Sequence, residues 1–278
     1  MKSYIYLLFV VVLSSCEFGK KESVTESVVQ PVERATFVNY QLQSIQDKKG
    51  PCNDASDSEK CFSIDIQYPV ISSGASRIVI DSINSQIEQD ILKFAFISEP
   101  KDDFKLLIEE MTQEYEAILK DNPDYNSGWS LEISSDIIFQ DSLYISTAST
   151  IFSFTGGAHP NSYQVYRSYD LATGKALELA DFLVEGFETK LNELAEIEFR
   201  MDKQIAPNKA LNDEGFFFED GRFKLNSNFA ILDRSLLFYY NPYEIGPYSI
   251  GPTELELKLT DYVDLIKPGG SVINALKN

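Results

Sequence analysis

Apolar residues recur at every second position in several segments of this chain and at three- or four-residue steps in others. The first pattern predicts strands that bury one face, and the second predicts amphipathic helices. Strands are expected over residues 36–42, 61–68, 129–139, 143–154, 162–169, 229–232, 236–240 and 253–259, and helices over 80–94, 104–119 and 187–201. The predicted fold class is α+β, with two small subdomains in which helices pack on mixed or mainly antiparallel sheets.

Prolines and capping residues set several expected boundaries. Pro69 should end the second strand, Pro100 should separate the first two helices, and Pro123 should end the second helix, because proline is not tolerated in the interior of a helix or of a central strand. Thr260 is expected to cap a short closing helix that runs to Ile266.

A turn-forming stretch, residues 151–162, lies at the midpoint of the chain and holds its only histidine, His159. Gly156 and Gly157 allow the positive φ angles that a sharp reversal needs. Pro160 biases His159 toward an extended conformation. Because the segments on either side each resemble a small α/β unit, we expect a domain boundary here, with one domain over residues 36–154 and another over 155–268.

The most unusual local feature is the pentapeptide Pro-Tyr-x-Ile-Gly, which occurs twice within residues 242–252. Prolines at this density predict a loop or a sheet edge rather than a central strand. Tyrosines beside a rigid loop offer flat surface for a sugar ring or a protein partner, or they fill the core while Gly and Pro direct the chain. The candidate binding residues are His159, Tyr240, Tyr243, Glu244 and Tyr248.

The chain has 278 residues and a formal net charge of -19, which is long enough for one or two domains with a full core. This acidity argues against a nucleic-acid partner, because affinity for a polyanion comes largely from Lys and Arg. It favours cationic partners, or it serves only to keep the protein soluble.

The start of the chain has the layout of a signal peptide, with Lys2, an apolar run over residues 4–13 and small residues before Cys16. The run is too short to span a membrane. Leu13-Ser-Ser-Cys16 resembles the bacterial lipobox, which implies that Cys16 is lipidated; the alternative is a plain secretory signal. We therefore expect a signal peptide over 1–16, a flexible tether over 17–35, and an exported protein anchored by lipid in the cell envelope, at the outer membrane, the periplasmic face of a membrane or the cell surface.

Cys52 and Cys61 flank a polar loop, and in an oxidising compartment they are expected to form a disulfide. A metal site would need more nitrogen or sulfur ligands than one distant histidine supplies. No cofactor is expected.

Catalytic patterns are weak in this sequence. There is no Gly-x-Ser-x-Gly motif, and His159 lies in a turn where a local hydrogen bond is the simpler role. The 43 acidic residues always provide carboxylate pairs, so their abundance identifies no glycosidase site. We expect no enzymatic activity, and an enzyme that acts on cell-wall glycan through unidentified carboxylates remains the alternative.

Three motifs in order carry a family resemblance: Phe154-Thr-Gly-Gly-Ala-His-Pro160, Tyr169-Asp-Leu-Ala-Thr-Gly-Lys175 with its continuation to Phe182, and Phe238-Tyr-Tyr-Asn-Pro-Tyr-Glu-Ile-Gly-Pro-Tyr248. Together they resemble the C-terminal domain of the anti-sigma-V factor RsiV and its relatives. Residues 36 to about 150 resemble the domain that usually precedes it, which also occurs in peptidoglycan deacetylases of the PdaC type.

The resemblance implies extracytoplasmic recognition of lysozyme-like proteins or of peptidoglycan. Proteins of the RsiV type hold a sigma factor through a cytoplasmic segment. If Cys16 is the mature terminus, no such segment remains, and we expect no direct sigma-factor binding. The deacetylase chemistry needs an aspartate and two histidines on one metal, so the single His159 implies that only the accessory domain is related. A structural envelope component without a small partner is a further possibility.

Overall fold

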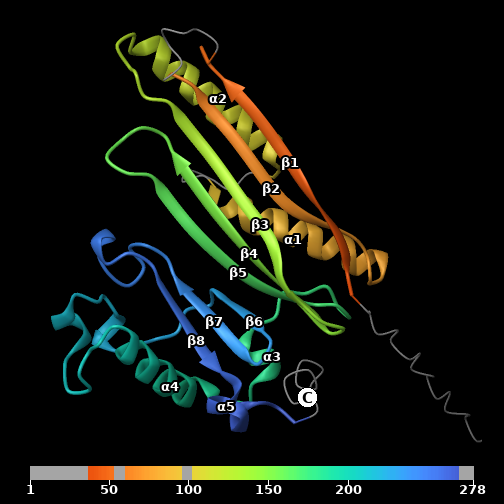
Figure 1. Ribbon diagram of the computed structural model, residues 1–278, viewed down its shortest axis with the longest axis vertical. Helices are drawn as coiled ribbons and strands as arrows, with labels where there is room; N and C mark the ends of the chain where they lie inside the picture. The colour runs from red at the N-terminus through yellow and green to blue at the C-terminus, as the bar shows by residue number, and fades with distance from the viewer. Residues whose placement is uncertain (1–36, 53–59, 96–101, 269–278) are drawn as a thin grey trace, which may run out of the picture. The chain divides into compact units, whose positions relative to one another are not determined.

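The computed structural model describes residues 37–52, 60–95 and 102–268 (Figure 1). The expected lipidation site Cys16 and the tether over residues 17–35 lie outside the described residues, so both stay predictions. None of the helices within the described ranges has the length and apolar character that crossing a membrane requires.

Five strands form the first sheet, in the spatial order β1-β2-β3-β4-β5 (Figure 1). Neighbouring strands run antiparallel except β2 and β3, which pair in parallel. A parallel pair needs a crossover connection, and here the crossover carries α1 and α2 on one face of the sheet (Figure 1). The bounds are β1 Asn39–Lys49, β2 Phe62–Ser73, α1 Arg77–Ala95, α2 Phe104–Asp121, β3 Trp129–Gln140, β4 Tyr144–Phe154 and β5 Asn161–Asp170.

The apolar faces of the strands and of α1 and α2 pack together in one core between the sheet and the two helices. Fully burying a large apolar side chain stabilises the fold by about 1.5–3 kcal/mol, so this packing holds α1 and α2 on the sheet. The buried members include Ile83, Ile87, Ile91, Leu107, Met111 and Tyr115 from the helices and Phe62, Ile64, Ile66, Leu131 and Ile133 from the strands.

The second sheet is antiparallel, in the order β6-β7-β8, and packs with α4 around a core rich in phenylalanine. Phe199 of α4 contacts the rings of Phe216, Phe218 and Phe223. The structure confirms the α+β class, with one mixed and one antiparallel sheet. The bounds are α3 Leu179–Phe182, α4 Phe187–Asp202, η1 Leu211–Glu214, η2 Glu219–Gly221, β6 Phe229–Leu232, β7 Ser235–Tyr240, η3 Tyr248–Ile250, β8 Thr253–Lys258, α5 Leu259–Tyr262 and η4 Val263–Leu265.

The turn-forming stretch at the chain's midpoint joins two strands of one sheet. β5 pairs with β4 along its whole length, from Asn161 opposite Ser153 to Asp170 opposite Tyr144. The boundary expected between residues 154 and 155 therefore falls inside the five-stranded sheet, and that sheet extends to Asp170. A hairpin turn and a domain linker use the same residue types, so the sequence of this stretch does not distinguish them. The pairing of β4 with β5 shows that it is a hairpin turn.

Two local predictions differ from the structure. β2 continues through Pro69, because β2 pairs with β3 only as far as Gln67, and the missing N–H of Pro69 then lies at an edge. Thr260 does not cap the closing helix, since α5 begins at Leu259 with Lys258 as its cap residue. The Leu259 N–H instead donates to the Arg234 carbonyl at 2.8 Å.

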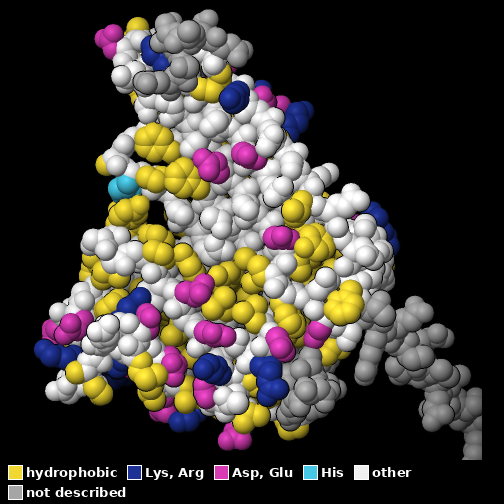
Figure 2. Space-filling model, in the orientation of Figure 1, with side chains coloured by type: hydrophobic (Ala, Val, Ile, Leu, Met, Phe, Trp, Pro, Cys, Tyr) yellow, Lys and Arg dark blue, Asp and Glu magenta, His cyan; other side chains and the backbone are white. Residues whose placement is uncertain are grey.

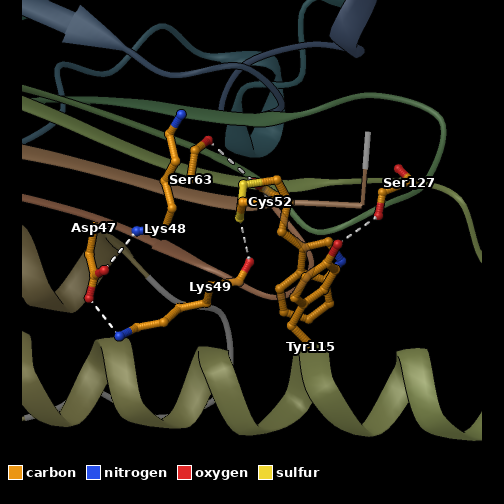
Figure 3. The surroundings of a disulfide bond; sticks show 9 residues. Asp47, Lys48, Lys49, Cys52, Ser63, Tyr115 and Ser127 are labelled. Carbon is orange, nitrogen blue, oxygen red and sulfur yellow. Dashed lines mark hydrogen bonds and ion pairs between the residues drawn. A yellow bond between two sulfur atoms is a disulfide. The ribbon is translucent and has the colours of Figure 1, made fainter. Parts of the chain in front are cut away.

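The expected disulfide between Cys52 and Cys61 is present, at the end of the β1–β2 pair (Figure 3). Cys61 accepts a backbone hydrogen bond from Trp129 N–H at 3.0 Å. Tyr115 of α2 donates its hydroxyl to the Ser127 carbonyl at 3.4 Å beside it. The disulfide thus lies where β1, β2 and the start of β3 meet.

A buried polar contact joins the two sheets. The Ser146 hydroxyl of β4 donates to the Ile231 carbonyl of β6 at 2.6 Å, and the Ile231 N–H donates to the Ser168 hydroxyl of β5 at 2.9 Å. The two hydroxyl oxygens lie 2.7 Å apart. Since Ser146 has already donated its proton, Ser168 donates to Ser146, and each donor in this ring is satisfied.

Asparagine side chains form further hydrogen bonds between the second half of the chain and the outer edge of β5. Asn241 accepts from Gln164 N–H and donates to its carbonyl, while Asn228 accepts from Tyr166 N–H and also donates to the Gln164 carbonyl. Further along, the Ser168 carbonyl accepts from Leu177 N–H. The second half of the chain therefore supplies partners that another strand would otherwise provide.

Replacing Ser146 with alanine tests the buried junction. The change leaves the Ile231 carbonyl and the Ser168 hydroxyl without their partner, and a buried unsatisfied polar group costs about 1–3 kcal/mol. We expect the free energy of unfolding, measured in urea, to fall by that amount. Ser162→Ala, an exposed position on β5, is the control and should shift it by less than about 0.5 kcal/mol. Equal shifts in the two variants would contradict this account of the junction.

Candidate functional site

The hairpin between β4 and β5 presents His159 at its tip. Gly156 and Gly157 have φ values of +82° and +129°, as the sequence predicted. A Cβ atom on Gly156 would collide with the Tyr125 hydroxyl. That hydroxyl accepts a hydrogen bond from Trp129 Nε1 at 3.0 Å, so the hairpin rests on a fixed side chain.

The first copy of the repeated pentapeptide forms a tight turn. Glu244 N–H donates to the Asn241 carbonyl at 3.1 Å, with Pro242 and Tyr243 between them. Tyr243 has a φ of +69°, in the left-handed region that glycine and asparagine favour and that costs other residues about 1–3 kcal/mol. The turn therefore holds an exposed tyrosine in an unfavourable backbone conformation.

Glu244 fixes this turn. One carboxylate oxygen accepts from Asn226 Nδ2 at 2.7 Å, and the other accepts from Asn241 N–H at 2.8 Å. Asn226 also donates to the Tyr239 carbonyl of β7. Glu244 was a candidate binding residue, and in the structure both of its carboxylate oxygens anchor the loop.

Tyr240 does not belong to the exposed surface. Its side chain is 1% exposed, and its hydroxyl donates to the Lys224 carbonyl at 2.8 Å. Burial, followed by the nearby charge of Glu244, raises the pKa of this hydroxyl far above its ordinary value. Tyr240 therefore stays protonated and structural, and the sequence pattern alone did not separate it from its exposed neighbours.

Three of the five candidate residues meet on the surface, and we call His159, Tyr243 and Tyr248 the aromatic cluster. The rings of His159 and Tyr248 stack, with centroids 4.4 Å apart and planes 14° apart. The ring of Tyr243 lies 5.5 Å from that of Tyr248. Tyr243 and Tyr248 are 59% and 41% exposed. Figure 2 shows the single histidine of the chain beside hydrophobic side chains on the surface.

Hydrogen bonds fix the orientation and the tautomer of His159. Its Nδ1 lies 3.2 Å from the Pro160 carbonyl, which can only accept, so Nδ1 carries the proton in the neutral ring. Nε2 lies 3.1 Å from the Tyr243 hydroxyl and accepts from it. Both ring nitrogens are therefore used by neighbours, and the local role expected for His159 extends to joining the two loops.

Sequence reasoning missed the residues that support the cluster. Asn241 ties the loop to Gln164 of β5, Asn226 joins Glu244 of the loop to the Tyr239 carbonyl of β7, and Tyr125 supports the hairpin. Asparagines at strand ends are common in turns, so their presence carried no distinguishing signal. Within the described ranges, His, Cys, Asp and Glu form no group of three or more that could hold a metal ion.

Comparison with protein families places two domains in this chain. Residues 55–162 match the family described as Deacetylase PdaC, and residues 180–260 match the family described as Protein of unknown function (DUF3298). The first match ends where β5 begins, and the second runs from α3 to α5. These two families indicate an extracytoplasmic protein associated with the cell envelope. No curated protein matches the sequence.

Two solved structures share the fold. A member of the DUF3298 family from Bacteroides fragilis is 20% identical, with a TM-score of 0.71, and the match covers 87% of this chain and 99% of that chain. A DUF3298 family protein from Pseudomonas aeruginosa is 19% identical, with a TM-score of 0.62, covering 83% and 95%. Both align over most of the chain, which shows that the two-sheet arrangement is common to these proteins.

The backbone conformation of Tyr243 gives a test of the loop. Asparagine tolerates a positive φ, whereas a β-branched residue does not. We expect Tyr243→Val to lower the free energy of unfolding by about 1–2 kcal/mol relative to Tyr243→Asn, measured by urea denaturation. Both variants remove the ring, so their difference isolates the backbone cost. Equal stability would show that the loop relaxes out of the conformation described here.

Proposed function

We propose that this protein is a lipid-anchored bacterial envelope protein that binds a lysozyme-like cationic protein without catalysing a reaction. The aromatic cluster of His159, Tyr243 and Tyr248 would form the contact surface. The observation that supports this proposal best is the contact among three exposed rings from two loops, in which His159 stacks on Tyr248 and bonds Tyr243, 84 residues away in the chain. Exposed aromatic residues of this kind are enriched where proteins bind partners.

The rigidity of the two loops supports a binding role. Ordering flexible side chains during association costs about 0.5–1.5 kcal/mol each. Here the Tyr243 hydroxyl is bonded to His159, and Glu244 holds the turn on Asn226. The rings are thus held in place before a partner arrives. The strained φ of Tyr243 fits the same interpretation, because backbone strain of this kind concentrates at functional sites.

The charge of the chain supports a cationic partner. A net charge of -19 accelerates encounter with a basic protein. Aromatic ring faces attract Lys and Arg side chains by about 0.5–2 kcal/mol each. The acidic residues would therefore attract the partner over a distance, and the aromatic cluster would hold it in contact.

Peptidoglycan is the second candidate ligand. The aromatic cluster contains no carboxylate or ammonium group, and flat uncharged rings suit a sugar ring as well as a cationic side chain. The non-catalytic part of the proposal is supported by His159, whose two ring nitrogens contact Pro160 and Tyr243 rather than a nucleophile or a carboxylate. An enzyme acting on wall glycan through other carboxylates is the competing view.

Binding of lysozyme to the full-length protein in detergent, at physiological salt, tests the proposed function. An unrelated basic protein of similar size is the control ligand, because any cation is attracted weakly to this chain and that attraction fades as salt rises. We expect tight binding to lysozyme alone. Equal weak binding to both proteins would contradict recognition of lysozyme, and the same assay with peptidoglycan fragments and a measurement of their turnover would then decide among the remaining views.

Variants of the aromatic cluster locate the contact. We expect Tyr248→Ala to weaken lysozyme binding by about tenfold or more, because truncating a central aromatic contact typically costs about 2 kcal/mol. The matched control is Phe37→Ala, since Phe37 is similarly exposed, at 61%, and lies on the segment before β1. Unchanged binding in Tyr248→Ala would place the contact elsewhere on the protein.

A further inference from the structure

The two edges of the five-stranded sheet differ. The outer edge of β5 is bonded by Asn228, Asn241 and the backbone of Leu177. The other edge is β1, which pairs with β2 on one side only. Among the described residues, no hydrogen bond reaches the backbone groups of Tyr40, Leu42, Ser44 or Gln46 from the free side.

The pairing with β2 shows which groups of β1 face outward. The N–H and C=O of Ile71 bond to the side chain of Asn84, so they point away from β1. Ile71 is opposite Tyr40, and in an antiparallel pair the groups of opposite residues point either toward each other or both away. Tyr40 therefore directs its N–H and C=O to the free edge, and by alternation so do Leu42, Ser44 and Gln46.

This open stretch lacks the features that usually protect an edge. Exposed edges are normally blocked by charged residues, by proline or by strong bulges. Residues 39–46 contain neither a charged residue nor a proline, and the register shifts only at their start, between Asn39 and Tyr40. The far end is closed, because Lys48 N–H donates to the Asp47 carboxylate at 2.7 Å (Figure 3).

We infer that β1 pairs with β1 of a second copy of this chain, antiparallel and with a two-fold axis at Gln43. In this register Tyr40 is opposite Gln46 of the second copy, and Leu42 is opposite Ser44 of the second copy. Every outward group of these four residues then has a partner.

The side chains fit the same register. Asp47 comes to lie opposite Asn39 of the second copy, and the lysines that follow it pass beyond the paired stretch, so no like charges face each other. The two copies of Leu42, a residue that is 41% exposed in the single chain, lie diagonally across the axis. At this separation of about 7–8 Å, long side chains on one face reach each other. In this register the strand therefore brings no like charges face to face and makes an apolar contact with its own copy.

The overall charge gives this contact a distinctive salt dependence. Two chains of net charge -19 repel each other, and added salt screens that repulsion. The dimer is therefore expected to tighten as salt rises from low to physiological concentration, which is opposite to the behaviour of a complex between this chain and a cationic protein. The association also does not involve the aromatic cluster, so it is independent of the proposed function.

Single cysteines in the full-length protein test the register. In the paired strands the two copies of residue 43 are directly opposite, with Cα atoms about 4.5 Å apart, which permits a disulfide. Gln43→Cys should form a covalent dimer under oxidising conditions. The matched control is Gln41→Cys, an exposed glutamine on the same face of the same strand. Its two copies would lie about 13 Å apart along the strands, so it should cross-link at least about tenfold less.

Sedimentation of the wild-type protein at two salt concentrations and hydrogen exchange complete the test. Dimer formation that rises with salt, together with protection of the outward amides of Tyr40, Leu42, Ser44 and Gln46 on dimerisation, is the expected result. Equal cross-linking at positions 41 and 43 would overturn the register. A protein that stays monomeric at all concentrations would overturn the inference, whether these amides are unprotected or are protected within the single chain. Protection that appears only when a peptide from another protein is added would also overturn it.

Discussion

The structure depends on how the second half of the chain satisfies the backbone of the first. An exposed strand edge carries a row of unpaired N–H and C=O groups, and burying such an edge without partners is costly. The outer edge of β5 avoids this cost through Asn228 and Asn241, and the buried ring of Ser146, Ser168 and Ile231 extends the same solution beneath the surface. Asn241 also forms the turn that carries Tyr243, because its carbonyl accepts from Glu244 N–H and its own N–H donates to the Glu244 carboxylate. Sheet packing and the candidate site therefore share this residue.

Much of the fold was predictable because burial leaves a periodic signature. The stripes that define α1 and α2 and the alternation in β3 and β4 correspond to side chains that pack in one core. The disulfide was predicted from two cysteines that flank a polar loop in a chain expected to be exported, and the structure contains it. The expected boundary near residue 154 differs from the sheet because pairing between β4 and β5 depends on residues on both strands. The local sequence predicts that the chain reverses direction, but it does not predict which strand pairs with the segment after the turn.

The candidate site shows the same limit at the level of single residues. His159, Tyr243 and Tyr248 could be picked from the sequence as a histidine in a turn and tyrosines in a proline-rich loop, and the structure brings them together. Tyr240 and Glu244 belong to the same loop, yet one is buried and the other bonds Asn226. The exposed residues differ from Tyr240 and Glu244 in the direction that each side chain takes from the loop backbone. The positive φ of Tyr243 sets that direction for its ring, and a pattern of residue types does not report a backbone angle.

The short parallel pairing between β2 and β3 has a consequence for how the β1–β2 hairpin is held in the sheet. β2 is bonded to β3 only from Phe62 to Gln67, and beyond that point the side chain of Asn84 takes the place of a neighbouring strand. The β1–β2 hairpin is thus attached to the remaining strands over about half of its length, whereas β3, β4 and β5 are paired nearly from end to end. Few interstrand hydrogen bonds therefore attach this hairpin to the meander of β3 to β5, and its place in the sheet depends on the packing of Phe62, Ile64 and Ile66 against α1 and α2.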